Sequence, residues 1–361
     1  MKLGHEVHIM TSNQLPLIRS KRSLTRSEVT NRIDGAVLHE LPFFKIFPHP
    51  NAVSEIRSIL RRCDILYVKN EIFELCLLKI LKTGMNMPII CGIHTAVFYP
   101  YNPSLRSKLH NILYMSKIYG YLLSQCSAIH VLNIFDQDLM RLRFKVKEHK
   151  IFLIPLTVDT QLFCPKDNVK VNPEDKEFKI LFLGKLDEQK GLDIFLDTIA
   201  ILSNNKEFDQ MIFSIVGSGE LEEYAHSFAQ TYPNVRYLGF VAQEKIVDLY
   251  NTHDVVVVPS RWETLSYVCL EAQSCGVPVI ATNIPGPNGI IENGKTGLLI
   301  PPEDCRSLGD AILSMYRIKR NAICTFKKMK AFSRENILKR LSSKAMMCKM
   351  ELLFRHVIRL H

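Results

Sequence analysis

This sequence lacks the features that identify membrane-spanning and zinc-binding proteins. No uninterrupted apolar run in its 361 residues approaches the length that spans a bilayer, and no signal-peptide h-region is visible. Its ten cysteines form no C-x-x-C pair, and Cys91, Cys126 and Cys269 lie inside apolar stretches. This pattern argues against a zinc or disulfide framework and favours reduced, packed thiols in a cytoplasmic protein.

The charge is distributed unevenly along the chain, although its net value is +10. Residues 1–165 hold 21 Lys and Arg against 12 Asp and Glu, residues 166–319 hold 14 against 22, and residues 320–361 hold 11 against 2. A basic first half and a basic tail suggest an anionic partner, such as a membrane surface or a lipid phosphate. Solvated faces and phosphate-site lysines explain the same charge equally well. Scattered arginines without a recognition motif argue against nucleic acid as a partner.

Short apolar runs alternate with helical stretches throughout, which predicts an α/β protein with two Rossmann-like, doubly wound domains. The expected strands are 6–11, 36–41, 64–69, 88–93, 127–132 and 151–155, then 178–184, 211–216, 235–239, 254–259, 277–281 and 297–300. We therefore predict a first domain over 1–163, a polar linker over 164–176 and a second domain over 177–330. A basic helix over 331–361 follows, with one apolar face formed by Ile337, Leu341, Ala345, Cys348 and Leu352.

The first residues of the sequence resemble the C-terminal end of a helix. Leu3 and Gly4 have the pattern of a helix C-terminus, and a strand follows at once. We therefore expect that the intact protein has a further segment upstream, and that its loss impairs catalysis.

Two glutamates seven residues apart, Glu263 and Glu271, are the most informative feature of the chain. They lie between the predicted buried strands 254–259 and 277–281, and Gly276 is a natural residue to end the intervening helix. Glu263 is then in the loop that enters the helix, and Glu271 lies roughly two turns in. The first N–H groups of a helix have no internal partner and attract anions. A nucleotide sugar, with hydroxyls on both sides of a diphosphate, suits such a site. An exposed-glutamate helix of any doubly wound domain is the alternative.

This segment resembles the signature of the family-four (group 1) retaining glycosyltransferases of the GT-B fold, and about residues 4 to 320 follow their pattern. The resemblance implies two domains facing a cleft, with a C-terminal helix that crosses back onto the first domain. It also implies that Glu271 binds the nucleotide ribose and that Glu263 holds the transferred sugar. Members usually begin with a strand and a Gly-rich loop before this segment, so the resemblance implies that these elements lie upstream.

Two further segments extend the predicted donor site. Gly184 ends a buried strand, and Lys185 and Lys190 in the following loop are able to neutralise a diphosphate. They match basic positions of the resembled family, although exposed loop lysines are the ordinary alternative. Gly217 begins a tight turn, but Glu222 replaces the third glycine of a dinucleotide fingerprint. The resemblance places the nucleotide base near Phe240 and Val241.

The first domain contributes one candidate, His94, at the end of a buried strand. In this position it faces the crevice of an open α/β sheet, where it is able to donate to a sugar hydroxyl or to the departing phosphate. Related enzymes often carry a histidine here. A histidine that caps a loop is an equally good interpretation. Asp136 and Asp138 invite a metal interpretation, but they lie at a predicted helix start, and we interpret them as structural.

The resemblance, together with these residues, implies a metal-independent, retaining glycosyltransferase that needs no cofactor. We expect Glu263 and His94 to be catalytic. The expected donor-binding residues are Gly184, Lys185, Lys190, Gly217, Phe240, Val241, Leu265, Ser266, Tyr267 and Glu271. The acceptor is expected to be a carbohydrate or a lipid-linked molecule, and the protein to lie in the cytoplasm or at the inner face of the membrane. Two alternatives stay open: a nucleotide-sugar epimerase of the same fold, and a catalytically impaired nucleotide-binding protein.

Overall fold

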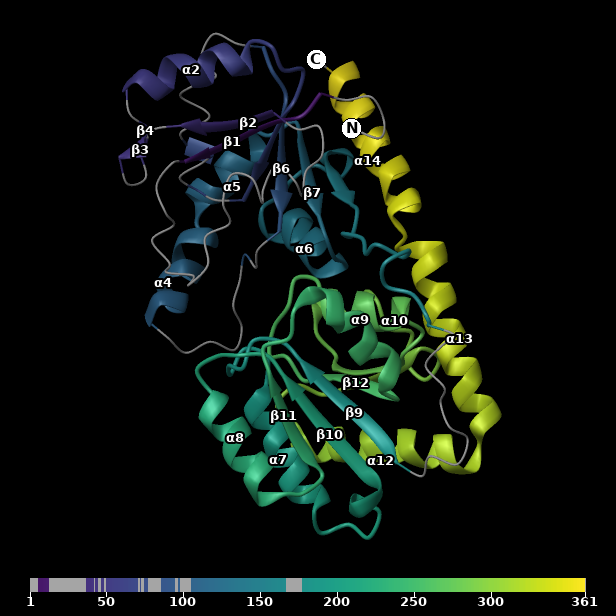
Figure 1. The fold of residues 1–361 in the computed structure, drawn as a ribbon. Coiled ribbons are helices and arrows are strands. Elements are labelled where there is room, and N and C mark those ends of the chain that lie inside the picture. Colours follow the sequence, from purple (N-terminus) through teal and green to yellow (C-terminus); the bar gives the residue numbers. More distant parts are fainter. Residues whose placement is uncertain are drawn as a thin grey trace.

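The structure of the chain is a computed structural model. It describes residues 6–12, 37–41, 43–44, 47–48, 50–70, 72, 75–76, 86–94, 97, 105–166 and 177–360. Most of the predicted linker lies outside the described residues. Figure 1 shows two α/β bodies, with a pair of long helices running along one side of both.

The first body contains two parallel sheets. Strand β1 (His8–Ser12) pairs with β2 (Val37–Leu41), and a four-stranded sheet has the order β5 (Leu66–Lys69), β6 (Ile89–Ile93), β7 (Ala128–Val131) and β8 (Ile151–Leu153). Strands β6 and β7 are buried along their whole length, because both faces of a parallel sheet are covered. The remaining elements are β3 (Phe43–Phe44), β4 (Phe47–Pro48), α2 (Pro50–Leu60), α4 (Leu105–Tyr114), α5 (Lys117–Ser124) and α6 (Ile134–Asp138).

The second body has one six-stranded parallel sheet in the order β11-β10-β9-β12-β13-β14. The strands are β9 (Phe178–Leu183), β10 (Met211–Val216), β11 (Val235–Gly239), β12 (Val255–Val258), β13 (Val279–Thr282) and β14 (Gly297–Ile300). The helices are α7 (Leu192–Leu202), α8 (Glu222–Thr231), α9 (Gln243–Thr252), α10 (Tyr267–Ser274), α11 (Pro285–Asn288) and α12 (Cys305–Asn321). The chain builds outward from β9 to β11 and then returns to place β12 on the other side of β9. This reversal between β9 and β12 creates a crevice at the carboxyl ends of the two strands, where ligands of doubly wound sheets bind.

All the strands predicted from the sequence are found within a few residues of their expected positions, and the α/β class with parallel sheets is confirmed. The domain boundaries stay predictions. The predicted C-terminal helix does cross back onto the first body, as Figure 1 shows. It is, however, two helices: α13 (Ile323–Arg340) and α14 (Ser343–Arg359). Ser342 separates them, because its hydroxyl caps α14 by accepting from the N–H of Ala345 at 3.4 Å.

The predicted apolar face of this segment is partly wrong. Ile337 and Leu341 are buried, but Leu352 is 66% exposed and Cys348 is exposed as well. The buried residues of α14 are instead Met346, Leu353 and Val357, and they pack against Ile90, Ala128 and Ile154 of the first body. The cap at Ser342 starts a new helix, so the apolar stripe of α13 does not continue in phase into α14.

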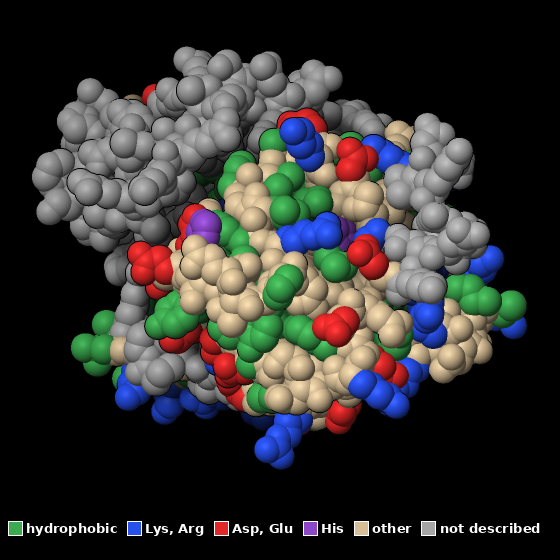
Figure 2. All heavy atoms as spheres, turned by 60° about the horizontal axis from the view of Figure 1, so that its bottom comes forward, with side chains coloured by type: hydrophobic (Ala, Val, Ile, Leu, Met, Phe, Trp, Pro, Cys, Tyr) green, Lys and Arg blue, Asp and Glu red, His purple; other side chains and the backbone are tan. Residues whose placement is uncertain are grey.

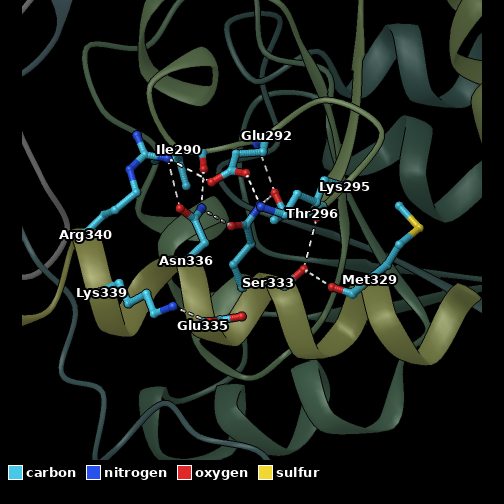
Figure 3. Close-up of polar contacts among 11 residues, drawn as sticks. Ile290, Glu292, Lys295, Thr296, Met329, Ser333, Glu335, Asn336, Lys339 and Arg340 are labelled. Atoms are coloured by element: carbon cyan, nitrogen blue, oxygen red, sulfur yellow. Dashed lines mark hydrogen bonds and ion pairs between the residues drawn. The ribbon is translucent and has the colours of Figure 1, made fainter.

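Helix α13 is fixed to the second body by buried polar contacts, which Figure 3 shows. Asn336 Nδ2 donates to the carbonyl of Ile290 at 2.7 Å and to Gln273 Oε1 at 3.1 Å, and Ser333 Oγ donates to the carbonyl of Thr296 at 3.1 Å. Close by, Arg334 donates to the carbonyl of Phe163, in the segment that leaves the first body, at 2.8 Å. Buried amides are costly when unpaired, so these bonds specify one position of α13 along the second body.

The adjacent residues Leu352 and Leu353 test the packing of α14. Leu353→Ala should lower the free energy of unfolding by about 2–5 kcal/mol, because a fully buried leucine leaves a cavity. Leu352→Ala, at an exposed position, should change it by less than ~0.5 kcal/mol. Urea denaturation followed by circular dichroism measures both. Equal effects would contradict the docking of α14 on the first body.

Candidate functional site

The crevice between β9 and β12 brings Lys190 and Glu263 into contact. Lys190 Nζ donates to Glu263 Oε1 at 2.6 Å, and Ser260 Oγ donates to the same oxygen at 2.9 Å. The Glu263 side chain is only 3% exposed. Its second oxygen, Oε2, is buried without a hydrogen-bond partner among the residues that the structure describes. A buried carboxylate oxygen without a partner keeps an unused capacity to accept a hydrogen bond.

Arg261 holds the loop after β12, which carries Glu263, against the loop after β9, which carries Lys190. The sequence did not single out this residue. Its N–H donates to the carbonyl of Gln189 at 2.9 Å, and its guanidinium donates to both carboxylate oxygens of Asp193 at 2.8 and 2.7 Å. It also binds Glu303, and the bonds to Asp193 and Glu303 raise the pKa of Arg261 above its ordinary value. Gly191 allows the loops to approach, because a Cβ there would lie 2.1 Å from the carbonyl oxygen of Pro259.

Lys185 and Lys190 differ in their surroundings. Lys185 is 58% exposed and pairs with Asp187 at 2.9 Å, which raises the pKa of the lysine. Asp187 also accepts from the backbone N–H of Lys190 at 2.9 Å, so this carboxylate organises the loop between the two lysines. Lys190 is engaged with Glu263, whereas the exposed Lys185 is able to reach an anion without losing a buried contact.

Glu271 has a separate partner, Tyr250, which the sequence also did not single out. The Tyr250 hydroxyl donates to Glu271 Oε2 at 2.8 Å, and the tyrosine is completely buried. Burial raises the pKa of Glu271, and the hydrogen bond from Tyr250 partly offsets this by stabilising the carboxylate. The bond fixes one carboxylate oxygen and leaves the other for a ligand.

Helix α10 begins between the two glutamates. Ser266 is its N-cap, with Oγ accepting from the N–H of Cys269 at 3.4 Å. Within the described part of the chain, no hydrogen-bond partner is found for the N–H groups of Leu265, Ser266 or Tyr267. These donors, together with the helix dipole, form an environment that favours an anion.

The remaining donor-site candidates lie at the same edge of the sheet. Gly217 follows β10 with φ 139°, and an added Cβ would lie 1.8 Å from the carbonyl oxygen of Gly184, so both positions need a close backbone approach. After β11, Phe240 is 72% exposed and Val241 is half-buried. The predicted candidates of the second body therefore lie at the carboxyl edge of one parallel sheet, although their roles stay predictions.

His94 lies directly after β6 and takes part in a chain of hydrogen bonds. The Tyr67 hydroxyl is 2.7 Å from His94 Nε2 and 2.6 Å from His130 Nδ1. Burial, with a smaller contribution from His130, lowers the pKa of His94 to about 4. His94 is therefore neutral at pH 7, so its imidazole carries a single N–H.

The first body also touches the second at the candidate site. Asn133 Nδ2 donates to the carbonyl of Thr264, next to Glu263, at 2.9 Å. Asn133 is the N-cap of α6 and bonds Asp136, whose burial raises its pKa to about 6. Asp138 pairs with Arg141 at the surface. Both aspartates thus have structural partners, and the described residues contain no group of three His, Cys, Asp or Glu side chains that could hold a metal.

Comparison with protein families gives two matches. Residues 1–162 match the model described as Glycosyltransferase Family 4, and residues 177–317 match the model described as Glycosyl transferases group 1.

Curated relatives are similar over parts of the chain. The UDP-Gal:alpha-D-GlcNAc-diphosphoundecaprenol alpha-1,3-galactosyltransferase of Escherichia coli is 29% identical over 236 residues, covering 62% of this chain and 59% of the relative. A D-inositol 3-phosphate glycosyltransferase of Paenarthrobacter aurescens is 31% identical over 178 residues, covering 46% and 43%. The chain thus spans about half of the length of these relatives.

Solved structures share the fold. Sucrose-phosphate synthase of Thermosynechococcus elongatus has a TM-score of 0.77 at 19% identity, covering all of this chain and 91% of the other. HepE of Anabaena, solved in complex with UDP, has a TM-score of 0.73 at 16% identity, covering 91% and 89%.

The two lysines provide a matched test of the Lys190–Glu263 pair. Lys190→Met should lower the free energy of unfolding by about 1–3 kcal/mol, because it removes the cation from a buried carboxylate. Lys185→Met, at an exposed position, should change it by less than ~0.5 kcal/mol. In the double variant Lys190→Met with Glu263→Gln, part of the loss should be recovered. Urea titrations of the native protein, Lys190→Met, Glu263→Gln and the double variant measure this coupling, and purely additive effects would contradict it.

Proposed function

Because this chain belongs to the group 1, family-four glycosyltransferases of the GT-B fold, we propose that it transfers a sugar from a nucleoside diphosphate sugar to an acceptor hydroxyl. We further propose that the configuration at the anomeric carbon is retained and that no metal takes part. The observation that supports this function best is the Lys190–Glu263 pair, with a buried, unpartnered carboxylate oxygen, at the switch point between β9 and β12.

In the proposed donor complex, the diphosphate lies between Lys185, Lys190 and the first N–H groups of α10. These groups stabilise the negative charge that grows on the leaving diphosphate as the glycosidic bond breaks. Glu271, oriented by Tyr250, accepts from the ribose hydroxyls. Glu263 Oε2 accepts from a hydroxyl of the transferred sugar. The base lies near Phe240 and Val241, and the UDP complex of HepE supports a nucleoside diphosphate as the ligand of this fold.

The acceptor is proposed to be a carbohydrate or a lipid-linked molecule. The name of the Escherichia coli relative includes a diphosphoundecaprenol acceptor, which supports the lipid-linked class. We place the reaction in the cytoplasm, in keeping with ten cysteines that are all free thiols. Among the described helices, none has the length and apolar character of a membrane span.

A peripheral contact with an anionic membrane is part of this proposal. On α4, Leu105, Leu109 and Ile112 share one face and are 83%, 65% and 71% exposed. Lys108 and Lys117 are exposed nearby. An apolar stripe with basic neighbours suits the interface of an anionic bilayer. On the face of the molecule in Figure 2, by contrast, Lys and Arg are interspersed with Asp and Glu.

The epimerase alternative is not favoured, since both matched families are glycosyltransferases. A nucleotide-binding protein without turnover stays open as the second alternative. Incubation of the protein with nucleoside diphosphate sugars separates the three functions. Release of nucleoside diphosphate that requires an added acceptor supports the transferase, and a changed sugar without acceptor supports the epimerase. Binding of donor without either product supports the protein without turnover.

Glu271→Ala tests the predicted ribose contact. The variant should bind UDP or GDP about 10- to 100-fold more weakly, because a charged hydrogen-bond acceptor for the ribose is removed. Isothermal titration calorimetry gives the dissociation constants. Glu244→Ala, at an exposed glutamate of α9, serves as the matched control and should bind as the native protein does. Unchanged nucleotide binding by Glu271→Ala would refute the role.

Ile112→Asp tests the membrane contact. The native protein should sediment with phosphatidylglycerol vesicles, less so at high salt, and the variant should bind about tenfold more weakly because an inserted side chain is lost. Leu352→Asp places the same change on α14, on the opposite side of the first body in Figure 1, and should not matter. Equal losses for both variants, or equal binding to neutral vesicles, would contradict the proposal.

A further inference from the structure

Each strand of the four-stranded sheet contributes one group to a continuous chain of hydrogen bonds. Tyr67 belongs to β5, His94 follows β6, His130 belongs to β7, and Ile154 follows β8. The Tyr67 hydroxyl lies between His94 Nε2 at 2.7 Å and His130 Nδ1 at 2.6 Å. At the far end, His130 Nε2 is 2.5 Å from the carbonyl oxygen of Ile154.

The direction of every bond in this chain follows from its last acceptor. A carbonyl oxygen only accepts, so the proton of His130 is on Nε2. A neutral imidazole has a single N–H, so His130 Nδ1 accepts the hydrogen of the Tyr67 hydroxyl. The Tyr67 oxygen then accepts from His94, whose proton is on Nε2. His94 Nδ1 is left without a proton, and it has no hydrogen-bond partner among the residues that the structure describes.

The surroundings keep both imidazoles neutral, which this assignment requires. Burial lowers the pKa of His94 and of His130, because a low-dielectric environment disfavours the charged form. The backbone is also adapted to the contact. A Cβ at Gly92 would lie 2.2 Å from the Tyr67 hydroxyl oxygen and 2.7 Å from the His94 ring. The hydrogen bond between the two side chains therefore needs glycine at this position of β6.

We propose that Tyr67 and His130 are positioning residues that hold His94 as the Nε2–H tautomer, so that its Nδ1 accepts a hydrogen bond from a hydroxyl of the sugar or of the acceptor. The role in recognition rests on the proposed function; the tautomer does not. The sequence alone led us to expect His94 as a donor to a hydroxyl or to the departing phosphate. With its N–H committed to Tyr67, His94 instead recognises hydroxyl groups and gives no hydrogen bond to a phosphate.

Nitrogen NMR of the full chain labelled with ¹⁵N-histidine tests the tautomer directly. His94 should show a protonated Nε2 and an unprotonated Nδ1, and its signals are assigned with His94→Gln. In Tyr67→Phe and in His130→Gln, the His94 nitrogens should shift toward the values of a mixed population of tautomers. The buried His253, which bonds Ser214 and the carbonyl of Leu249 in the second body, is the internal control and should not shift. A proton on His94 Nδ1 in the native protein would overturn the proposal, as would an unchanged His94 in both variants.

Kinetics with a nucleoside diphosphate sugar and acceptor tests the consequence for turnover. Tyr67→Phe should lower kcat by about tenfold, which corresponds to the free energy of one hydrogen bond. The affinity for the nucleotide should stay unchanged. Tyr316→Phe removes a tyrosine hydroxyl that bonds Gln210 in the second body, and it should keep the native rate. A native rate in Tyr67→Phe would overturn the positioning role. If the native protein shows the predicted tautomer but no turnover with any donor, the proposed function fails and the tautomer assignment stands.

Discussion

The side chain of Glu263 carries a carboxylate where water hardly reaches it, and the rest of the candidate site depends on how this charge is compensated. A buried carboxylate without partners would cost several kcal/mol, on the order of a large part of the stability of a domain. Lys190 and Ser260 provide the compensation, and they come from the loops after β9 and β12. These loops are neighbours because the chain reverses its direction of sheet growth between the two strands. The sheet topology is therefore the condition for the ion pair.

The loop that carries Glu263 is also one place where the two bodies meet. Asn133, at the start of α6, bonds the carbonyl of Thr264. On the other side of the molecule, Arg334 of α13 bonds the carbonyl of Phe163 and also that of Ser274, at the end of α10. Thr264, at one end of the segment 264–274, is thus held by the first body, and Ser274, at the other end, is held by α13, which is docked on the second body.

Most of the fold could be predicted from the sequence, because buried parallel strands are short apolar runs of a kind that few other elements share. The C-terminal segment shows the limit of predicting elements from apolar patterns. Apolar periodicity alone predicts one helix that continues through Ser342. The cap at Ser342 instead starts a second helix, so Leu353 and not Leu352 is buried against the first body. A capping serine and an ordinary helix-surface serine look the same in a sequence, and a shift of one residue turns the helix by about 100°.

The candidate site likewise contains residues that could be predicted from the sequence and residues that could not. Glu263, Glu271 and the two lysines belong to local patterns, and the sequence was sufficient to select them. Arg261 and Asn133 act through partners 68 and 131 residues away, so no spacing could select them. Tyr67 and His130 look like ordinary strand residues until the sheet order places β5 and β7 on either side of β6, where the two side chains meet.

The two bodies differ in the kind of group that they offer to a ligand. The second body offers cations and unpaired N–H groups, which suit a diphosphate, and its carboxylates suit hydroxyls. The first offers His94, a neutral acceptor that suits a hydroxyl alone. A charged His94 would attract the diphosphate to the first body and compete with Lys185 and Lys190 for it. A neutral His94 avoids this competition, so in the proposed reaction the nucleotide binds to one body and the other body recognises the hydroxyl groups that approach it.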